Sequence, residues 1–172
     1  MDVNEVEIQS MKEIVDTCVQ IPLFTYEMQK NAPRPDGEYA AIKCISSVNP
    51  GFDEIKILDN PDGTQSFRTR GLRILTFYIL FSREGQEYID FDNSFYRPDV
   101  NQKLRKVKFA AMGKEALNLA TIQMETNWEV RKGVKMQFNV TREQITQVGT
   151  MSNASVGGKF YDGNTVVTIE GK

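Results

Sequence analysis

The stretch of sequence from residue 128 to residue 140 reads WEVRKGVKMQFNV. In an extended chain its apolar side chains share one face, with Lys132 as the only break: Trp128, Val130, Val134, Met136, Phe138 and Val140. The opposite face carries Glu129, Arg131, Lys135, Gln137 and Asn139. A period of two with one polar face is typical of a strand in an antiparallel sheet. The stretch therefore predicts a long strand, with a short continuation through Ile145 and Val148.

Other strands are indicated upstream. From Phe67 to Ser82 the chain becomes apolar on both faces between Leu72 and Phe81, which predicts a strand buried on both sides, with a bulge at Gly71. Shorter alternating runs predict strands over 42–48 and 55–57, and NPDGT at 60–64 predicts a turn between strands. The last residues, KFYDGNTVVTIEG, predict a hairpin that turns near Asp162-Gly163.

Two segments have helical spacing. Apolar residues from Val3 to Val19 recur at helical intervals, so we expect an amphipathic helix that ends before Pro22. A second helix should open at Pro98, and a further helical stretch should follow Gly113. The apolar stripes of these two stretches are Val100, Leu104, Val107 and Ala111, then Ala116, Leu117 and Ala120.

Together these elements predict one α+β domain, with mainly antiparallel sheet and with helices packed on one sheet face. We expect an N-terminal helix within 1–21 and an extended, proline-containing arm over 22–38. The α+β core should cover 39–150, and a C-terminal hairpin or tail should cover 151–172.

Composition narrows the function. The chain has 172 residues, a formal net charge of −2 and no histidine, which removes the usual general base and the usual zinc ligand. Cys18 and Cys44 are too few for a disulfide framework, so reduced thiols are expected. No apolar run is long enough to cross a bilayer, and the acidic N-terminus is unlike a signal peptide. We therefore expect no enzyme, no cofactor, no metal and no membrane partner.

Charged clusters are the remaining candidates for a site. Glu84, Glu87, Asp90 and Asp92 could supply paired carboxylates, although a solvated loop explains them more simply. Lys103, Arg105, Lys106 and Lys108 could bind phosphate or form the polar face of a helix. The basic strand residues Arg68, Arg70, Arg131 and Lys135 could face a channel or a subunit boundary, or could simply be solvated.

The arm before the first strand has an unusual stiffness. QKNAPRPDGE, residues 29–38, contains Pro33 and Pro35, which fix φ and push the preceding residues into extended conformations. We expect Pro33, Arg34 and Pro35 to lie either at a subunit interface or back on the chain's own sheet.

The order of these motifs resembles the neck and tail-terminator proteins of tailed bacteriophages, in particular the phage neck terminator family. The likeness is carried by NAPRPDGEYAAIKCIS, RILTFYILFS, the helix after FYRPD, and NWEVRKGVKMQFNV, over about residues 22–150. The loop EGQEYIDFDNS departs from the pattern, in which the long strand leads more directly into a helix.

The resemblance implies a structural virion protein that forms a ring, a hexamer, at the head–tail junction. Such a ring would cap the tail tube, join the head connector and leave a channel for DNA. The implied partners are other copies of the chain, tail-tube proteins, sheath proteins if the tail contracts, neck proteins, and genomic DNA bound without sequence specificity. The expected location is the virion, after assembly in the host cytoplasm. The alternatives are another ring of the same particle, such as a collar, gateway, tube or baseplate component, or a small ligand-binding domain or enzyme.

Overall fold

The alternating stretch at residues 128–140 belongs mainly to one long strand, β8 (Lys132–Val148). The computed structural model describes residues 3–28, 35–82, 85–117, 122–124, 127–129 and 132–148. The other elements, in chain order, are α1 (Glu5–Val19), β1 (Thr25–Glu27), β2 (Ala40–Val48), β3 (Glu54–Asp59), β4 (Gln65–Phe81), α2 (Gln86–Asn93), the 3-10 helix η1 (Ser94–Tyr96), α3 (Pro98–Val107), β5 (Phe109–Leu117), β6 (Ile122–Met124) and β7 (Asn127–Glu129). The predicted α+β class is confirmed.

Contacts divide the chain into two compact units. Unit 1 comprises Met1–Phe52 and Gly71–Arg142, and unit 2 comprises Asp53–Arg70 and Glu143–Lys172. Strands β4 and β8 contribute residues to both units.

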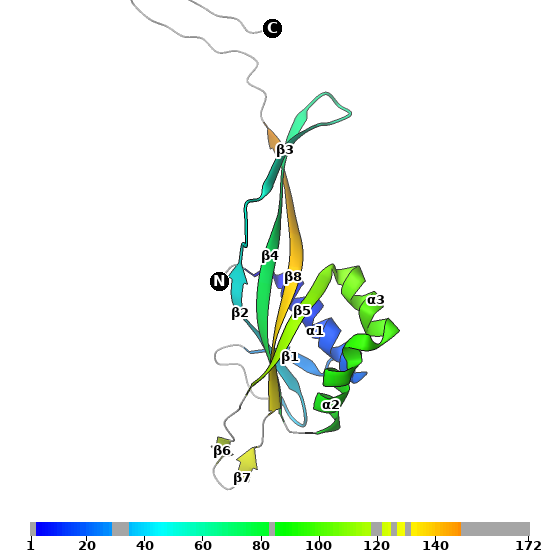
Figure 1. Ribbon diagram of the computed structural model, residues 1–172, viewed down its shortest axis with the longest axis vertical. Coiled ribbons are helices and arrows are strands. Elements are labelled where there is room, and N and C mark those ends of the chain that lie inside the picture. The colour runs from blue at the N-terminus through cyan, green and yellow to red at the C-terminus, as the bar shows by residue number, and fades with distance from the viewer. Residues whose placement is uncertain are drawn as a thin grey trace, which may run out of the picture. The chain divides into compact units, whose positions relative to one another are not determined.

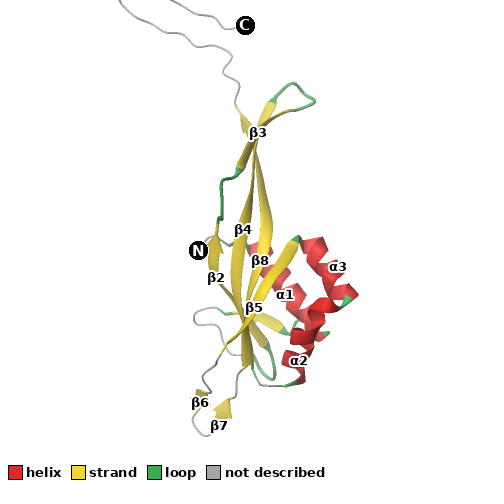
Figure 2. Cartoon of the chain, in the orientation of Figure 1, coloured by secondary structure: helices red, strands yellow, loops and turns green. Residues whose placement is uncertain are grey.

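The main sheet has the strand order β1-β2-β4-β8-β5, and β3 pairs with β4. The β2–β4, β3–β4 and β5–β8 pairs are antiparallel, whereas β1 runs parallel to β2. In unit 1, the three α-helices lie on one side of this sheet (Figures 1 and 2). The predicted arrangement of helices on one sheet face is therefore confirmed for this unit.

The core of unit 1 lies between the helices and the sheet. Alternate residues of β8 point into it, as the sequence predicted: Val134, Met136, Phe138 and Val140 are buried. The rings of Phe77 and Phe109 lie 6.3 and 5.5 Å from the ring of Phe138, centroid to centroid. Helix α1 adds Met11, Ile14, Val15 and Cys18, all fully buried. The helical spacing read from residues 3–19 is thus the spacing of core side chains.

Strand β4 is less buried than its sequence suggested. Leu75, Phe77, Ile79 and Phe81 alternate into the core, but Tyr78 and Leu80 on the other face are only half-buried. A register shift lies in β2 between Cys44 and Ser46, and the bulge expected at Gly71 stays a prediction. Gly71 falls between the stretch of β4 that pairs with β2 and the stretch that pairs with β3.

The helix predicted from Pro98 forms but ends earlier than expected. Pro98 occupies the first turn of α3, where its missing N–H costs no hydrogen bond, and Lys108 ends the helix in a left-handed conformation with φ of 60°. The predicted continuation through Ala111 and the helical stretch after Gly113 are wrong, because the next nine residues form β5 along β8. Ala120 lies outside the described residues.

The segment expected to be irregular contains regular structure. Thr25–Glu27 of the predicted arm form β1, held beside Ala40–Ile42 of β2. The charged stretch before Pro98, which we expected to be a loop or a short element, forms the short helices α2 and η1. Trp128 belongs to β7, which pairs with β6, so the predicted strand over 128–140 is divided between two sheets. Val130 and the C-terminal hairpin fall outside the described residues.

Unit 2 contains a hairpin made by β3 and the first residues of β4. The predicted turn at 60–64 is confirmed: the Asp62 carboxylate accepts hydrogen bonds from the Thr64 N–H at 3.0 Å and from its hydroxyl at 2.7 Å. Gly63 has φ of 82°, a conformation that glycine adopts without strain. Among the described residues of this unit only Ser66 is buried.

None of the described helices combines the length and the apolar character needed to span a membrane.

Candidate assembly surface

The hairpin of unit 2 has one charged face and one apolar face. The register pairs Glu54 with Arg70 and Lys56 with Arg68, so these four side chains project from the same side. The other face carries Ile55 opposite Thr69 and Ile57 opposite Phe67. Arg68 and Arg70 therefore project together.

Two of the basic side chains on these strands, Arg68 and Lys135, form ion pairs with acids. The Arg68 Nη2 atom lies 3.3 Å from Glu54 Oε2. In unit 1, Lys135 projects away from the core face of β8, and its Nζ atom lies 3.0 Å from Oε2 of Glu115 on β5. Arg131 lies outside the described residues. The face on which Lys135 lies is therefore locally charge-balanced rather than uniformly positive.

The predicted interface residues of the arm fall largely outside the described chain. Pro33 and Arg34 are not described, and Pro35 is half-buried. The segment begins and ends on the chain's own sheet: the Met28 N–H donates to the Ile42 carbonyl at 2.8 Å, and the Tyr39 N–H donates to the Ser82 hydroxyl at 3.0 Å.

The acidic cluster does not gather into a single site. Asp92 binds Lys114, Asp90 accepts a hydrogen bond from Gln86 at 2.7 Å, and Glu84 lies outside the described residues. Across the described ranges, no three carboxylates or thiols are grouped in a way that could hold a metal ion.

The basic helix α3 is tied to α1. The Lys103 Nζ atom lies 2.5 Å from Oε2 of Glu13, and this hydrogen bond lowers the pKa of Glu13 below its usual value. Arg105, Lys106 and Lys108 are exposed. The polar face of the helix is thus partly a packing contact, and nothing in its geometry forms a phosphate cradle.

Two more arginines hold the elements of unit 1 together. Arg142 of β8 makes a two-pronged bond with Glu7 of α1, Nε to Oε1 at 2.7 Å and Nη2 to Oε2 at 2.6 Å. Arg97 donates to the Cys18 carbonyl at 2.9 Å and to the Thr17 carbonyl at 3.3 Å, which satisfies acceptors in the last turn of α1. These bonds serve the fold.

Both cysteines are buried and free. Burial raises the pKa of the Cys18 thiol to about 11 and raises the pKa of Cys44. A thiol with a raised pKa and no access to solvent is a poor nucleophile. Neither residue has the environment of a catalytic cysteine.

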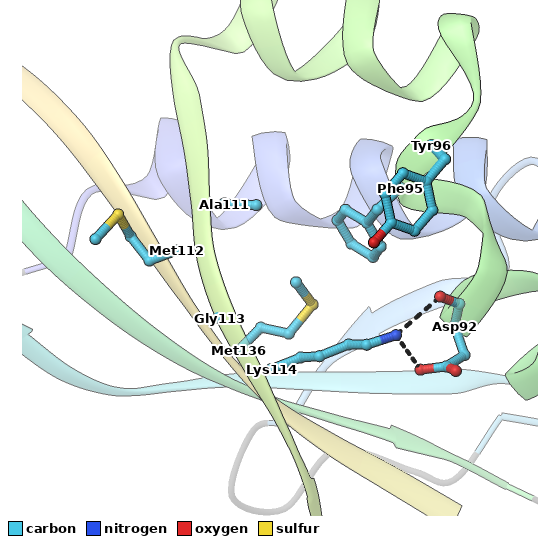
Figure 3. A pocket seen from close by; sticks show the side chains of 8 residues that line it. All are labelled: Asp92, Phe95, Tyr96, Ala111, Met112, Gly113, Lys114 and Met136. Carbon is cyan, nitrogen blue, oxygen red and sulfur yellow. Dashed lines mark hydrogen bonds and ion pairs between the residues drawn. The ribbon is translucent and has the colours of Figure 1, made fainter.

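A hollow that the sequence analysis missed opens between η1 and β5. Its volume is about 170 Å³, and Figure 3 shows the side chains that line it, among them Asp92, Phe95, Tyr96, Ala111, Lys114 and Met136. Lys114 closes one end by donating to Asp92, 2.9 Å from Nζ to the carbonyl oxygen. Tyr96 is 93% exposed and Met112, at the β5 bulge, is 60% exposed. Large apolar side chains therefore gather around an open depression.

Strand β5 borders this hollow and ends the sheet. It pairs with β8 on one side, and no strand of the described chain pairs with its other side. Its residues from Ala110 to Ala116 are all exposed. An unpaired strand edge presents N–H and C=O groups that favour pairing with another strand. The alanines and the Lys-Glu pair in KFAAMGKEAL, residues 108–117, favour a helix rather than a strand. Only Gly113 is a sequence signal for the bulge beside it.

An open sheet edge, an apolar hollow beside it and ion-paired strands are typical of proteins that act by binding other protein molecules. The family model described as phage neck terminator protein matches residues 8–164, and this chain belongs to that family. None of the curated proteins matches it.

Membership supports a structural role in the neck of a bacteriophage particle. The resemblance read from the arm, the strands and the helix after Pro98 is confirmed.

Proposed function

We propose that copies of this chain assemble head-to-tail into a closed ring, a hexamer, at the head–tail junction of the particle. The ring caps the tail tube, contacts the head connector and leaves a channel through which the genome passes. The match to the neck terminator family over residues 8–164 carries this proposal. It is also supported by the unpaired edge of β5, because contacts between unlike surfaces close into rings when the rotation between copies permits.

The basic strand residues suit a channel that conducts DNA. Each contact between a fixed basic side chain and a phosphate raises the affinity for DNA. Several free cations per subunit would therefore hold the DNA instead of letting it pass. Arg68 paired with Glu54 and Lys135 paired with Glu115 present positive charge that is already balanced. In the proposal, Arg68, Arg70, Arg131 and Lys135 face the channel or a subunit boundary.

The proline-containing arm is assigned to the contact between subunits. Pro33, Arg34 and Pro35 would lie across the neighbouring copy, because a stiff segment loses little conformational entropy when it docks. Deleting the arm is a poor test, since β1 and β2 are parallel and the chain between them must cross back along the sheet. Replacing Pro33 and Pro35 with glycine keeps that connection. The double variant should melt cooperatively and only slightly below wild type, because glycine gives the unfolded chain more freedom, yet it should enter particles less efficiently. Normal incorporation would remove the arm from the interface.

The ring itself is tested on assembled particles. Tails isolated from cells that carry a tagged copy of the protein should show the label at the neck, in a single ring whose symmetry can be read from averaged electron micrographs. Label along the whole tube, at the baseplate or nowhere in the particle would refute the proposed position. Tails of irregular length in cells lacking the protein would support the capping role, whereas uniform tails would contradict it.

A further inference from the structure

Two of the strand edges in the described chain, one in each unit, have features that fit each other. The edge of β5 lies beside the hollow, which is a feature of unit 1. The other edge belongs to β3 in unit 2, which pairs only with β4 among the described strands. We propose that β3 of one copy adds as a strand to the free edge of β5 of a second copy and seats an isoleucine in the hollow. This inference rests on the proposed ring and names its interface.

The acceptor has both parts that strand addition requires. Main-chain groups along an open edge provide the hydrogen bonds, and a pocket beside the edge selects alternate side chains of the incoming strand. Met136 and Ala111 form the apolar side of the hollow on the sheet, and Phe95 and Tyr96 face them from η1 (Figure 3). Because its acid and its amine are already bonded to each other, the hollow favours an apolar group over a charged one.

The donor has the matching pattern. Ile55 is 64% exposed and Ile57 is 58% exposed, although burial of an apolar side chain of this size is favourable. They are two residues apart on a strand, so both project to the same face and meet successive positions along a partner. A docking partner would cover this exposed apolar face of β3.

The charged faces are complementary as well. On β5, Lys114 lies opposite Met136 and Glu115 lies opposite Lys135, so the hollow and the Glu115 carboxylate are on different faces of the strand. An incoming β3 that turns Ile55 and Ile57 toward the hollow places Glu54 and Lys56 on the face that carries Glu115 and its partner Lys135, so charges of both signs are present on each side. Opposite charges on neighbouring strands stabilise the pair, whereas the reverse orientation would leave both isoleucines in water.

DNA is a poor occupant of this surface, because the hollow offers no free cation and the isoleucines offer nothing to a phosphate. Pairing of unlike edges also distinguishes the proposal from a symmetric dimer. A β3–β5 contact uses a different surface on each copy, which is the kind of contact that continues around a ring.

Crosslinking in assembled particles tests the contact directly. One copy carries Ile57→Cys and another carries Ala111→Cys, and a short bismaleimide is added to particles that contain both. The buried Cys18 and Cys44 give little background. A covalent dimer should form in mixed particles and in neither single-variant population. The matched control replaces Ile57→Cys with Ile145→Cys, since Ile145 is 59% exposed but lies on β8.

Charge substitution gives an independent measurement. Ile57→Asp should lower incorporation into particles by about tenfold or more, as expected for an anchor residue of an interface, while Ile145→Asp should leave it unchanged. Neither should shift the melting curve of the isolated protein, because both side chains are exposed.

The outcomes separate the two proposals. Wild-type protein located at the neck without a 57–111 crosslink, or with an equal crosslink in the Ile145→Cys control, would overturn the β3–β5 contact and leave the ring intact. Absence of the wild-type protein from particles would overturn both.

Discussion

Strands of unit 1 bury alternate side chains beneath three helices, whereas the strands of unit 2 leave most of their described side chains exposed. Phe138 in unit 1 is fully buried, and Ile57 in unit 2 is 58% exposed, although both sit on β-strands. The same secondary structure thus carries two different tasks. Unit 1 has a core of its own, whereas unit 2 exposes apolar side chains, which in our proposal dock on another copy.

The sharpest way to break this comparison is to truncate one side chain in each unit. Phe138→Ala should cost about 3–5 kcal/mol in free energy of unfolding, because it leaves a cavity beside Phe77 and Phe109. Ile57→Ala should change it by no more than about 0.5 kcal/mol. Urea denaturation of the purified protein measures both values. Equal losses would mean that the isoleucine already has a buried role in the monomer.

The second-largest loss of stability is expected when the ion pair between Glu7 of α1 and Arg142 of β8 is broken. Glu7→Gln should destabilise the protein by about 3 kcal/mol, because the Arg142 guanidinium would lose its carboxylate partner in a site largely closed to solvent. The control is Glu5→Gln, which alters an exposed acid in the same helical turn and should be nearly neutral. A small loss at Glu7 would show that water reaches Arg142 freely.

A smaller effect should appear as the pH is lowered. The hydrogen bond from Lys103 holds the pKa of Glu13 below its ordinary value of 4.5, so the pair stabilises the fold above that pH. The contribution disappears as the pH falls through the folded-state pKa. Lys103→Met should therefore cost at most about 1 kcal/mol at pH 7, and the difference from wild type should shrink in acid. A difference that persists at pH 3 would point to lost packing rather than lost charge.

The smallest effect on folding stability is expected for Lys135, on the face of β8 that points away from the core. An effect on function should accompany it. Lys135→Glu should cost about 0.3 kcal/mol in unfolding free energy, and the swap with Glu115→Lys should restore it. The double variant Arg131→Glu and Lys135→Glu should also fold, yet impair ring closure or DNA passage. Plaque assays and electron micrographs of tails check this; normal infectivity with intact tails would remove these residues from both the channel and the boundary.

Periodic, deeply buried elements could be predicted from the sequence. The spacing of Met11, Ile14 and Val15 and the alternation of Val134, Met136 and Phe138 arise directly from the geometry of a helix and a strand. Strand β5 could not be found in this way, because its alanines and its Lys114-Glu115 pair favour helix and only pairing with β8 makes it a strand. Strand β1 has three residues, too few for any period to show.

Only part of the candidate assembly surface could be predicted from the sequence. The shared face of Arg68 and Arg70 follows from their parity on one strand. The acidic partners of Arg68 and Lys135 lie far away in the sequence: Glu54 is 14 residues from Arg68, and Glu115 is 20 residues from Lys135. The hollow depends on η1 lying beside β5, a tertiary contact that no local pattern encodes.

The bond between Glu7 and Arg142 joins residues 135 positions apart. During synthesis the first helix therefore leaves the ribosome long before its partner strand, on the order of ten seconds earlier at typical elongation rates. Throughout that interval β1 and β2 can contact the helix, but β8 and its buried side chains are still missing. Proteins dominated by such distant contacts fold slowly, so nascent chains of this protein should depend on chaperones until translation has passed β8.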